Sequence, residues 1–144
     1  MTIRPIEVSD LPAITDLVGM LKLPDRALAD WSGVSERGVV ATDEEGEIAG
    51  GSWFVSGTTP ELFIGVRPDC QGRGVGKRVL AANVAQAVAL GLWALAVVVK
   101  RDNDPVLRLL EGYNTRRQDE TPEGLVIVLV LNDELRLGPG SRNV

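Results

Sequence analysis

"RPDCQGRGVGKRVL", residues 67–80, sets three glycines at alternate positions among several cations. The glycines are Gly72, Gly74 and Gly76. The cations are Arg67, Arg73, Lys77 and Arg78. Glycine is costly to order, so this spacing indicates that the backbone itself approaches a ligand closely. The surrounding positive charge indicates that the ligand is an anion.

The rest of the chain has the composition of one acidic, globular domain. It has 144 residues, of which 44% are hydrophobic and 24% charged, enough to bury a core. A net charge of −5 argues against a nucleic-acid partner. The N-terminus has no apolar signal core and no apolar run is long enough to cross a bilayer, so we expect no membrane partner and a cytoplasmic location. A single cysteine, Cys70, fits a reducing compartment.

The chain contains no histidine. The most common metal ligand and the usual proton shuttle at neutral pH are therefore missing, and we expect no metal site. Nucleophilic mechanisms that pair serine or cysteine with histidine are excluded within this chain. Cys70 lies beside the glycine loop, but without a histidine to activate it we expect an incidental loop residue.

Apolar periodicity and turn residues predict alternating strands and helices. In chain order the predicted elements are a strand over 2–8, a helix over 11–21, a short helix within 23–31, a hairpin over 38–57 with its turn at 44–46, a strand over 61–66, a helix over 75–91, a strand over 93–99, a helix over 104–112, and a hairpin of 115–120 with 125–131. Ser9 or Asp10 is the predicted N-cap of the first long helix, and Asp104, before Pro105, that of the last.

The middle of the chain predicts a parallel pair of strands. Strand 61–66 is nearly all apolar, which is typical of a central strand. With the helix over 75–91 and the strand over 93–99 it forms a βαβ unit. We expect a single α/β domain over 1–137 and a loose C-terminal tail over 138–144.

Two familiar phosphate-binding loops fit the glycine stretch poorly. A Walker A loop needs glycine at 71 and serine or threonine at 78, but the chain has Gln71 and Arg78. A Rossmann fingerprint would need glycine at 77, which is lysine, and a loop that follows the strand directly. Asp102 does mimic the acid that binds a ribose, so a dinucleotide-binding domain stays a weaker alternative.

A third pattern fits better. Gln71, Gly74 and Gly76 follow a strand that ends in Val66-x-Pro68, which resembles the Gln/Arg-x-x-Gly-x-Gly/Ala pyrophosphate motif of the GCN5-related N-acetyltransferase (GNAT) family. The order of elements agrees with that family over nearly the whole chain. A second signature matches in part. Asn103, Leu109 and Glu111 are in place, Leu110 stands where the family usually has tyrosine, and Asn114-Thr115 replaces its Gly-Phe pair.

The resemblance implies a GNAT-like α/β (α+β) fold: a mixed, mostly antiparallel sheet with a central, splayed parallel strand pair flanked by helices. It implies an acetyltransferase domain that uses acetyl-CoA and moves the acetyl group to a primary amine by direct attack in a ternary complex. The implied cofactor contacts are Val66, Gln71, Gly72, Arg73, Gly74, Val75, Gly76, Lys77 and Asn103.

Each residue that would carry out the chemistry has a second possible role. Glu61 opens the central strand, where the family often has a catalytic carboxylate; it is either the base for the amine or a solvent-exposed strand start. Asn103 either contacts the pantetheine arm or a water, or is a turn residue. Leu110 cannot donate a proton to the leaving thiolate, and Tyr113, three residues later, is predicted not to replace it.

Other questions stay open in the sequence. A non-catalytic acyl-CoA-binding or regulatory module is the main alternative to an enzyme. The acceptor is a small-molecule or peptide amine whose identity no motif specifies, and the closing hairpin offers an edge for a homodimer. Trp31, Trp53 and Phe54 could line an acceptor pocket, but aromatic residues in a strand or helix are more often core.

Overall fold

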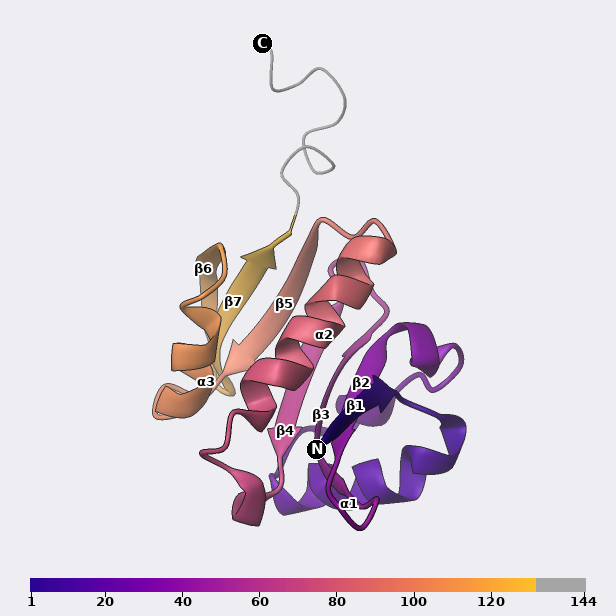
Figure 1. Cartoon of the computed structure of the whole chain (residues 1–144). Helices are drawn as coiled ribbons and strands as arrows, with labels where there is room; N and C mark the ends of the chain where they lie inside the picture. The colour runs from indigo at the N-terminus through magenta and orange to yellow at the C-terminus, as the bar shows by residue number, and fades with distance from the viewer. Residues whose placement is uncertain (132–144) are drawn as a thin grey trace.

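Seven strands of the computed structural model, which describes residues 1–131, form one sheet (Figure 1). Their order across the sheet is β1-β2-β3-β4-β5-β7-β6. The strands are β1 (Thr2–Pro5), β2 (Gly38–Thr42), β3 (Ile48–Val55), β4 (Glu61–Val66), β5 (Ala94–Val99), β6 (Thr115–Thr121) and β7 (Gly124–Val130). Only β4 and β5 pair in parallel among the described strands, so the predicted mixed, mostly antiparallel sheet is confirmed.

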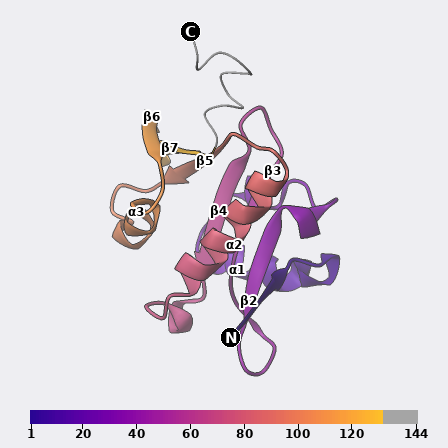
Figure 2. The same cartoon turned by 45° about the horizontal axis from the view of Figure 1, so that its top comes forward.

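Helices cover both faces of this sheet. They are α1 (Leu11–Met20), α2 (Val75–Ala89) and α3 (Asp104–Leu110). Alternation along β4 sends Leu62 into a cluster with Leu80 of α2, and Phe63 into a cluster with Val18 of α1. Helices α2 and α3 therefore share one face and α1 packs on the other (Figures 1 and 2).

Of the two predicted helix caps, that of α3 differs in the structure and that of α1 agrees in position. Asn103, not Asp104, is the N-cap of α3, and its Oδ1 accepts a hydrogen bond from the Val106 N–H at 3.3 Å. Asp10 is the N-cap residue of α1, one of the two predicted, but its side chain does not cap that helix. Its carboxylate instead accepts from the Glu7 N–H and from Arg4, and so closes the preceding 3₁₀ turn, Val8–Asp10. The hydrogen bond from Arg4 lowers the pKa of the Asp10 carboxyl.

Strand β4 lies at the centre of the sheet, as its apolar sequence predicted. It pairs with β3 along its whole length, but with β5 only through Glu61 and Ala96. The Ala96 N–H donates to the carbonyl oxygen of Pro60 at 2.8 Å. Beyond that point the two strands part toward their C-terminal ends (Figure 1). The predicted splayed parallel pair is confirmed.

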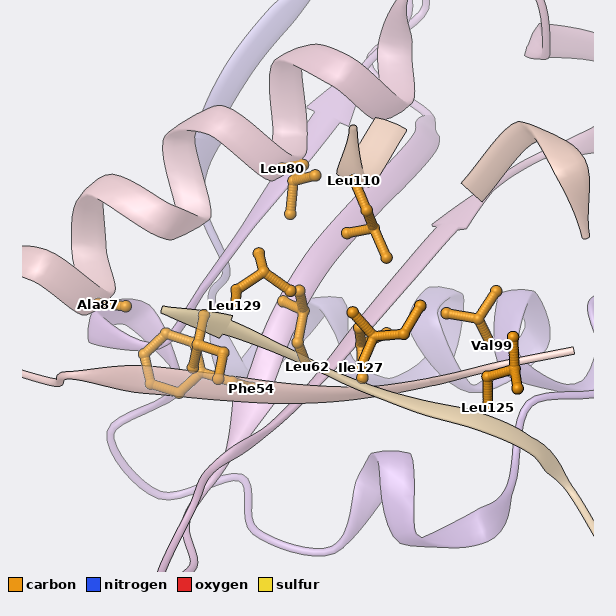
Figure 3. Close-up of a cluster of buried hydrophobic side chains, with 11 residues drawn as sticks. Phe54, Leu62, Leu80, Ala87, Val99, Leu110, Leu125, Ile127 and Leu129 are labelled. Carbon is orange, nitrogen blue, oxygen red and sulfur yellow. The ribbon is translucent and has the colours of Figure 1, made fainter. Parts of the chain in front are cut away.

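The largest hydrophobic cluster fills the space between the sheet and helices α2 and α3. Figure 3 shows Leu80 and Leu110 pointing from these helices toward side chains of the sheet such as Leu129. Of the aromatic residues, Trp53 and Phe54 are fully buried, and Trp31 packs partly against the cluster under α1. Within the described residues no helix is both long and apolar enough to span a membrane.

A buried polar network joins α2 to the sheet. Asn83 is fully buried, and its Oδ1 accepts a hydrogen bond from the Ser52 hydroxyl at 2.9 Å. Its Nδ2 donates to the backbone oxygen of Arg37 and to Gln86 Oε1. Gln86 in turn donates to the carbonyl oxygen of Gly38. Because each of these groups has a partner, the network specifies how α2 sits on β2 and β3.

The predicted tail over 138–144 and the last predicted domain residues, 132–137, lie outside the described residues. Strand β6 is the outermost strand on its side of the sheet, and the homodimer through this hairpin stays a prediction.

We predict that Asn83→Ala lowers the free energy of unfolding by about 2 kcal/mol, because the buried Ser52 hydroxyl loses its acceptor and the Arg37 carbonyl loses one of its donors. Urea unfolding followed by circular dichroism measures the change. Val88→Ala, on the exposed face of the same helix, is the control and should change stability by less than about 0.5 kcal/mol. Equal losses in the two variants would contradict the assignment.

Candidate active site

Two glycines of the loop have a backbone conformation that other residues rarely adopt. Gly72 and Gly74 have φ angles of +78° and +80°, in the left-handed region that favours glycine. Gly74 is the N-cap of α2. A Cβ at either position would meet no atom within 4 Å, so the space in front of the loop is open.

The N-terminus of α2 faces this open space. The Arg78 N–H makes the first helical hydrogen bond, to the Gly74 carbonyl oxygen at 3.2 Å, so the N–H groups before it have no partner one turn earlier. These groups and the helix dipole attract an anion. Gly76 has a different role, since a Cβ there would lie 3.1 Å from Leu109 Cδ1 and crowd the side chain of α3 that packs against it.

Arg67 holds the start of the loop and is not available to a ligand. Its guanidinium donates to Asp69 at 2.6 Å, to Asp43 at 3.2 Å and to Cys70 Sγ at 3.3 Å. Hydrogen bonding to Arg67 lowers the pKa of Asp69, while the Glu47 backbone N–H is the main cause of the lowered pKa of Asp43. Arg67 was predicted to be one of the cations around an anion, but in the structure it ties the loop to the β2–β3 turn.

A cleft of about 1070 Å³, here called the loop cleft, lies between the glycine loop, β4 and α3. Of the predicted cofactor contacts, those that line it are Val66, Gln71, Gly72, Gly74, Val75, Gly76, Lys77 and Asn103. Arg73 is exposed and does not line it. Val75 is 2% exposed and packs in the core, so only its backbone is free to meet a ligand.

The edge of β4 that faces β5 carries free backbone groups. The Arg67 N–H bonds to the carbonyl oxygen of Ala49 on β3. Because an antiparallel ladder alternates, the N–H groups of Ile64 and Val66 point the other way, toward β5. The carbonyl oxygen of Val66 accepts a hydrogen bond from Gln71 Nε2 at 3.1 Å.

A second cleft of about 830 Å³, here called the Glu61 cleft, lies on the other side of this gap. Both clefts are lined by Leu21, Leu23, Ile64, Asn103 and Val106. Ile64 lies on β4, and Asn103 follows β5, so the two clefts meet where these strands part. A ligand in one cleft can therefore reach a ligand in the other.

Glu61 lies in this second cleft within an ion cluster. Arg26 Nε and Nη2 donate to the two carboxylate oxygens of Glu61 at 2.7 and 2.9 Å. The third guanidinium nitrogen of Arg26, Nη1, donates to the Glu123 carboxylate at 2.9 Å. The hydrogen bonds with Glu61, and to a smaller extent those with Glu123, raise the pKa of Arg26 above its ordinary value. Sequence reasoning missed Arg26 and Glu123, because they lie 35 and 62 residues from Glu61 and no local motif connects them.

The residues of the second signature divide between core and cleft. Leu110 is 3% exposed and belongs to the main hydrophobic cluster. Tyr113 lines the loop cleft, and burial raises the pKa of its phenol. Helix α3 ends before Tyr113, as Gly112 and Asn114 indicated. Among residues 1–131 no group of histidine, cysteine or carboxylate side chains is arranged to hold a metal ion.

The sheet is mostly antiparallel, with one parallel pair that parts beside the N-terminus of α2. It is not the doubly wound parallel sheet of a dinucleotide-binding domain, so that weaker alternative is wrong. Residues 8–113 match the Acetyltransferase (GNAT) family. The chain belongs to this family.

Known proteins agree with the family assignment. The chain is 36% identical over 89 residues to a mycothiol acetyltransferase of Clavibacter michiganensis subsp. michiganensis, a stretch that covers 60% of this chain and 29% of that relative. A phosphinothricin acetyltransferase of Sinorhizobium meliloti in complex with acetyl-CoA superposes with a TM-score of 0.75, 21% identity and coverage of 92% and 89% of the two chains. A chain of the NatC complex bound to a Gag peptide and CoA superposes with a TM-score of 0.76 and 14% identity. The match covers 91% of this chain and 98% of that chain. At these identities the two structures show a shared fold.

We predict that Arg67→Ala speeds modification of the single thiol, Cys70, by Ellman's reagent about tenfold or more. Cys70 is 4% exposed, and Arg67 holds its turn closed, so the variant opens this segment more often. Arg73→Ala, which removes an exposed loop cation, is the control and should leave the rate unchanged. A slower reaction in Arg67→Ala would contradict the prediction.

Proposed function

We propose that the protein transfers the acetyl group of acetyl-CoA to a primary amine by direct attack in a ternary complex. The observation that carries this proposal is the meeting of the two clefts at Ile64 and Asn103. The loop cleft leads to the anion-binding end of α2, and the Glu61 cleft leads to solvent on the opposite side. The arrangement suits two substrates that enter separately and react in the gap.

The loop cleft fits the cofactor. The N–H groups of Val75, Gly76 and Lys77 bind the pyrophosphate, and the left-handed glycines let it approach. The Lys77 ammonium adds charge at the rim. The Asn103 side-chain oxygen is already occupied by the Val106 N–H, so its amide nitrogen is the group that meets the pantetheine arm or a water.

Acetyl-CoA supplies an activated acyl group, a thioester. The Val66 N–H, on the open edge of β4, donates to the thioester oxygen. The amine nitrogen forms the new bond to the acyl carbon while the carbon–sulfur bond breaks. The amine must lose a proton to attack, and Glu61 accepts it. Arg26 occupies one lone pair on each carboxylate oxygen of Glu61, which leaves a second on each for the amine.

The thiolate that leaves needs no side-chain acid. Leu110 is buried and apolar, and the raised pKa of Tyr113 makes its phenol a weaker acid than a thiol of ordinary pKa. A thiol with a pKa near 8.5 is a tolerable leaving group, and water protonates it. We therefore assign no donor among the described side chains.

The main competitor is a module that binds acyl-CoA without reacting. Two observations favour it: Arg26 engages both oxygens of Glu61, and the usual tyrosine position is a core leucine. A screen for CoA release in the presence of small-molecule amines and peptide N-termini tests the proposal. Turnover that depends on an amine supports the enzyme. Tight acetyl-CoA binding with no turnover on any amine class would favour the module.

We predict that Gly74→Ala weakens CoA binding at least about tenfold, because its methyl group enters the open space from which the pyrophosphate approaches α2. Gly91→Ala is a matched control, with φ +79° and open space at the other end of the same helix. Both variants carry similar backbone strain, about 1 kcal/mol. Titration calorimetry measures the affinities. Equal affinity in the two variants would overturn the pyrophosphate assignment.

We predict that Glu61→Gln lowers kcat about a hundredfold or more and changes the KM for acetyl-CoA little, because proton removal belongs to the chemical step. Steady-state rates across pH measure both constants. Glu123→Gln also removes a carboxylate from Arg26 and is the control that should keep kcat. Wild-type kcat in Glu61→Gln at every pH would remove Glu61 from the mechanism.

A further inference from the structure

The lysines of this chain are placed unevenly. There are three, against twelve arginines, in a chain of net charge −5. Lys77 lines the loop cleft, and the other two, Lys22 and Lys100, both line the Glu61 cleft. Two of the three lysines, both exposed, thus line the cleft to which we assign the acceptor.

Lys22 has an unusual backbone. It follows the last turn of α1 with φ +56°, the only non-glycine residue with positive φ among the described residues. The Leu23 N–H bonds to the carbonyl oxygen of Val18, and the Lys22 N–H to that of Gly19, as in a Schellman ending, where glycine is the preferred residue. Lysine here costs stability that glycine would not, which points to a use for its side chain.

Lys100 comes from the other wall of the cleft. It follows β5, whose end is held closely by the β6–β7 turn: a Cβ at Gly124 would lie 2.3 Å from the Val99 carbonyl oxygen and 3.0 Å from the Lys100 nitrogen. The end of α1 packs instead on β4, where a Cβ at Gly65 would lie 2.8 Å from Leu21 Cδ1. Lys22 therefore follows a helix end that packs on β4, and Lys100 directly follows β5.

The other charges of this cleft are mostly neutralised. Its charged lining consists of Lys22, Arg26, Lys100, Arg101, Glu61, Asp102 and Glu123. Arg26 is paired with Glu61 and Glu123, and Arg101 with Glu120. Lys22, Lys100 and Asp102 make no ion pair within residues 1–131. Arg26 has two carboxylate partners, so Lys22 and Lys100 are the cations of this lining that have no carboxylate partner of their own within residues 1–131.

We propose that Lys22 and Lys100 bind a carboxylate of the acceptor, so that the substrate is an amino acid or another primary amine that carries a carboxylate. This rests on the proposed acetyl transfer. The amine lies in the gap beside Glu61, and the carboxylate lies between the two ammonium groups, which form charge-assisted hydrogen bonds with it. A single negative charge fits better than a phosphate dianion, because Asp102, Glu61 and Glu123 share the same cleft.

The test compares free amino acids with their amides as acceptors for wild-type enzyme, Lys22→Gly and Lys100→Gln. The amide lowers the pKa of the neighbouring amine, so the measure is how each variant changes the ratio of kcat/KM for acid over amide. We expect each variant to lower this ratio roughly tenfold, the size of one charge-assisted hydrogen bond. Arg116→Gln removes an exposed charge that lines neither cleft and should leave the ratio unchanged.

Further measurements distinguish the possible outcomes. Lys22→Gly should keep or raise the melting temperature, since glycine suits φ +56°, so a lost ratio cannot come from unfolding. An amino phosphonate that outcompetes the matching amino acid, or an unchanged ratio in both variants, would overturn the carboxylate site. Acetyl-CoA affinity of all variants, measured by calorimetry, should equal that of wild type. A wild type that does not bind acetyl-CoA would instead overturn the proposed function itself, and this inference with it.

Discussion

Beyond Glu61 and Ala96, the parallel strands β4 and β5 form no further ladder pairs with each other. Each has a complete antiparallel partner on its outer side, β3 for β4 and β7 for β5, so the sheet stays continuous although its centre opens. Separation leaves backbone N–H and carbonyl groups on the inner edges without ladder partners, which is costly unless another group binds them. One of these, the Val66 carbonyl, is taken by Gln71. The remaining groups make the gap a place where a polar ligand is stabilised.

The same opening explains why the site has two approaches. Helix α2 begins beside the C-terminal end of β4, and its free N–H groups face the loop cleft. The Glu61 cleft lies toward the end of α1 and the β6–β7 turn. Because both clefts reach Ile64 and Asn103, a reacting pair can meet without either partner passing through the core.

Ion pairs arrange the segments around this gap more than they stabilise the fold. Arg26 joins the Asp25–Leu28 turn to the start of β4 and to the β6–β7 turn, and Arg67 joins the glycine loop to the β2–β3 turn. These pairs are partly exposed: the side chains of Arg26 and Glu123 are 38% and 53% accessible. Such pairs contribute little free energy, so their main effect is on where the loops lie. The buried Asn83 network, in contrast, has the burial that makes a polar group costly to leave unpaired.

The sequence by itself determined the order of the elements and the central position of β4, and it has glycine at the loop positions that take positive φ. These follow from local physics: apolar runs form buried strands, and only glycine takes positive φ without strain at Gly72 and Gly74. The bounds 61–66 of the central strand agree with prediction to the residue. Most predicted contacts of the loop also line its cleft, because they lie within one short segment.

Tertiary structure alone decided which charges are free and which side chains reach a cleft. The pattern could not reveal that Arg67 is committed to Asp43, that Arg26 holds Glu61, or that Leu110 faces the core, since each depends on segments far apart in the chain. Asn103 became the cap of α3 in place of Asp104 because the turn after β5 brings its side chain to the Val106 N–H. Residues far apart in the chain come together only when the elements pack, and no local sequence pattern indicates which of them will meet.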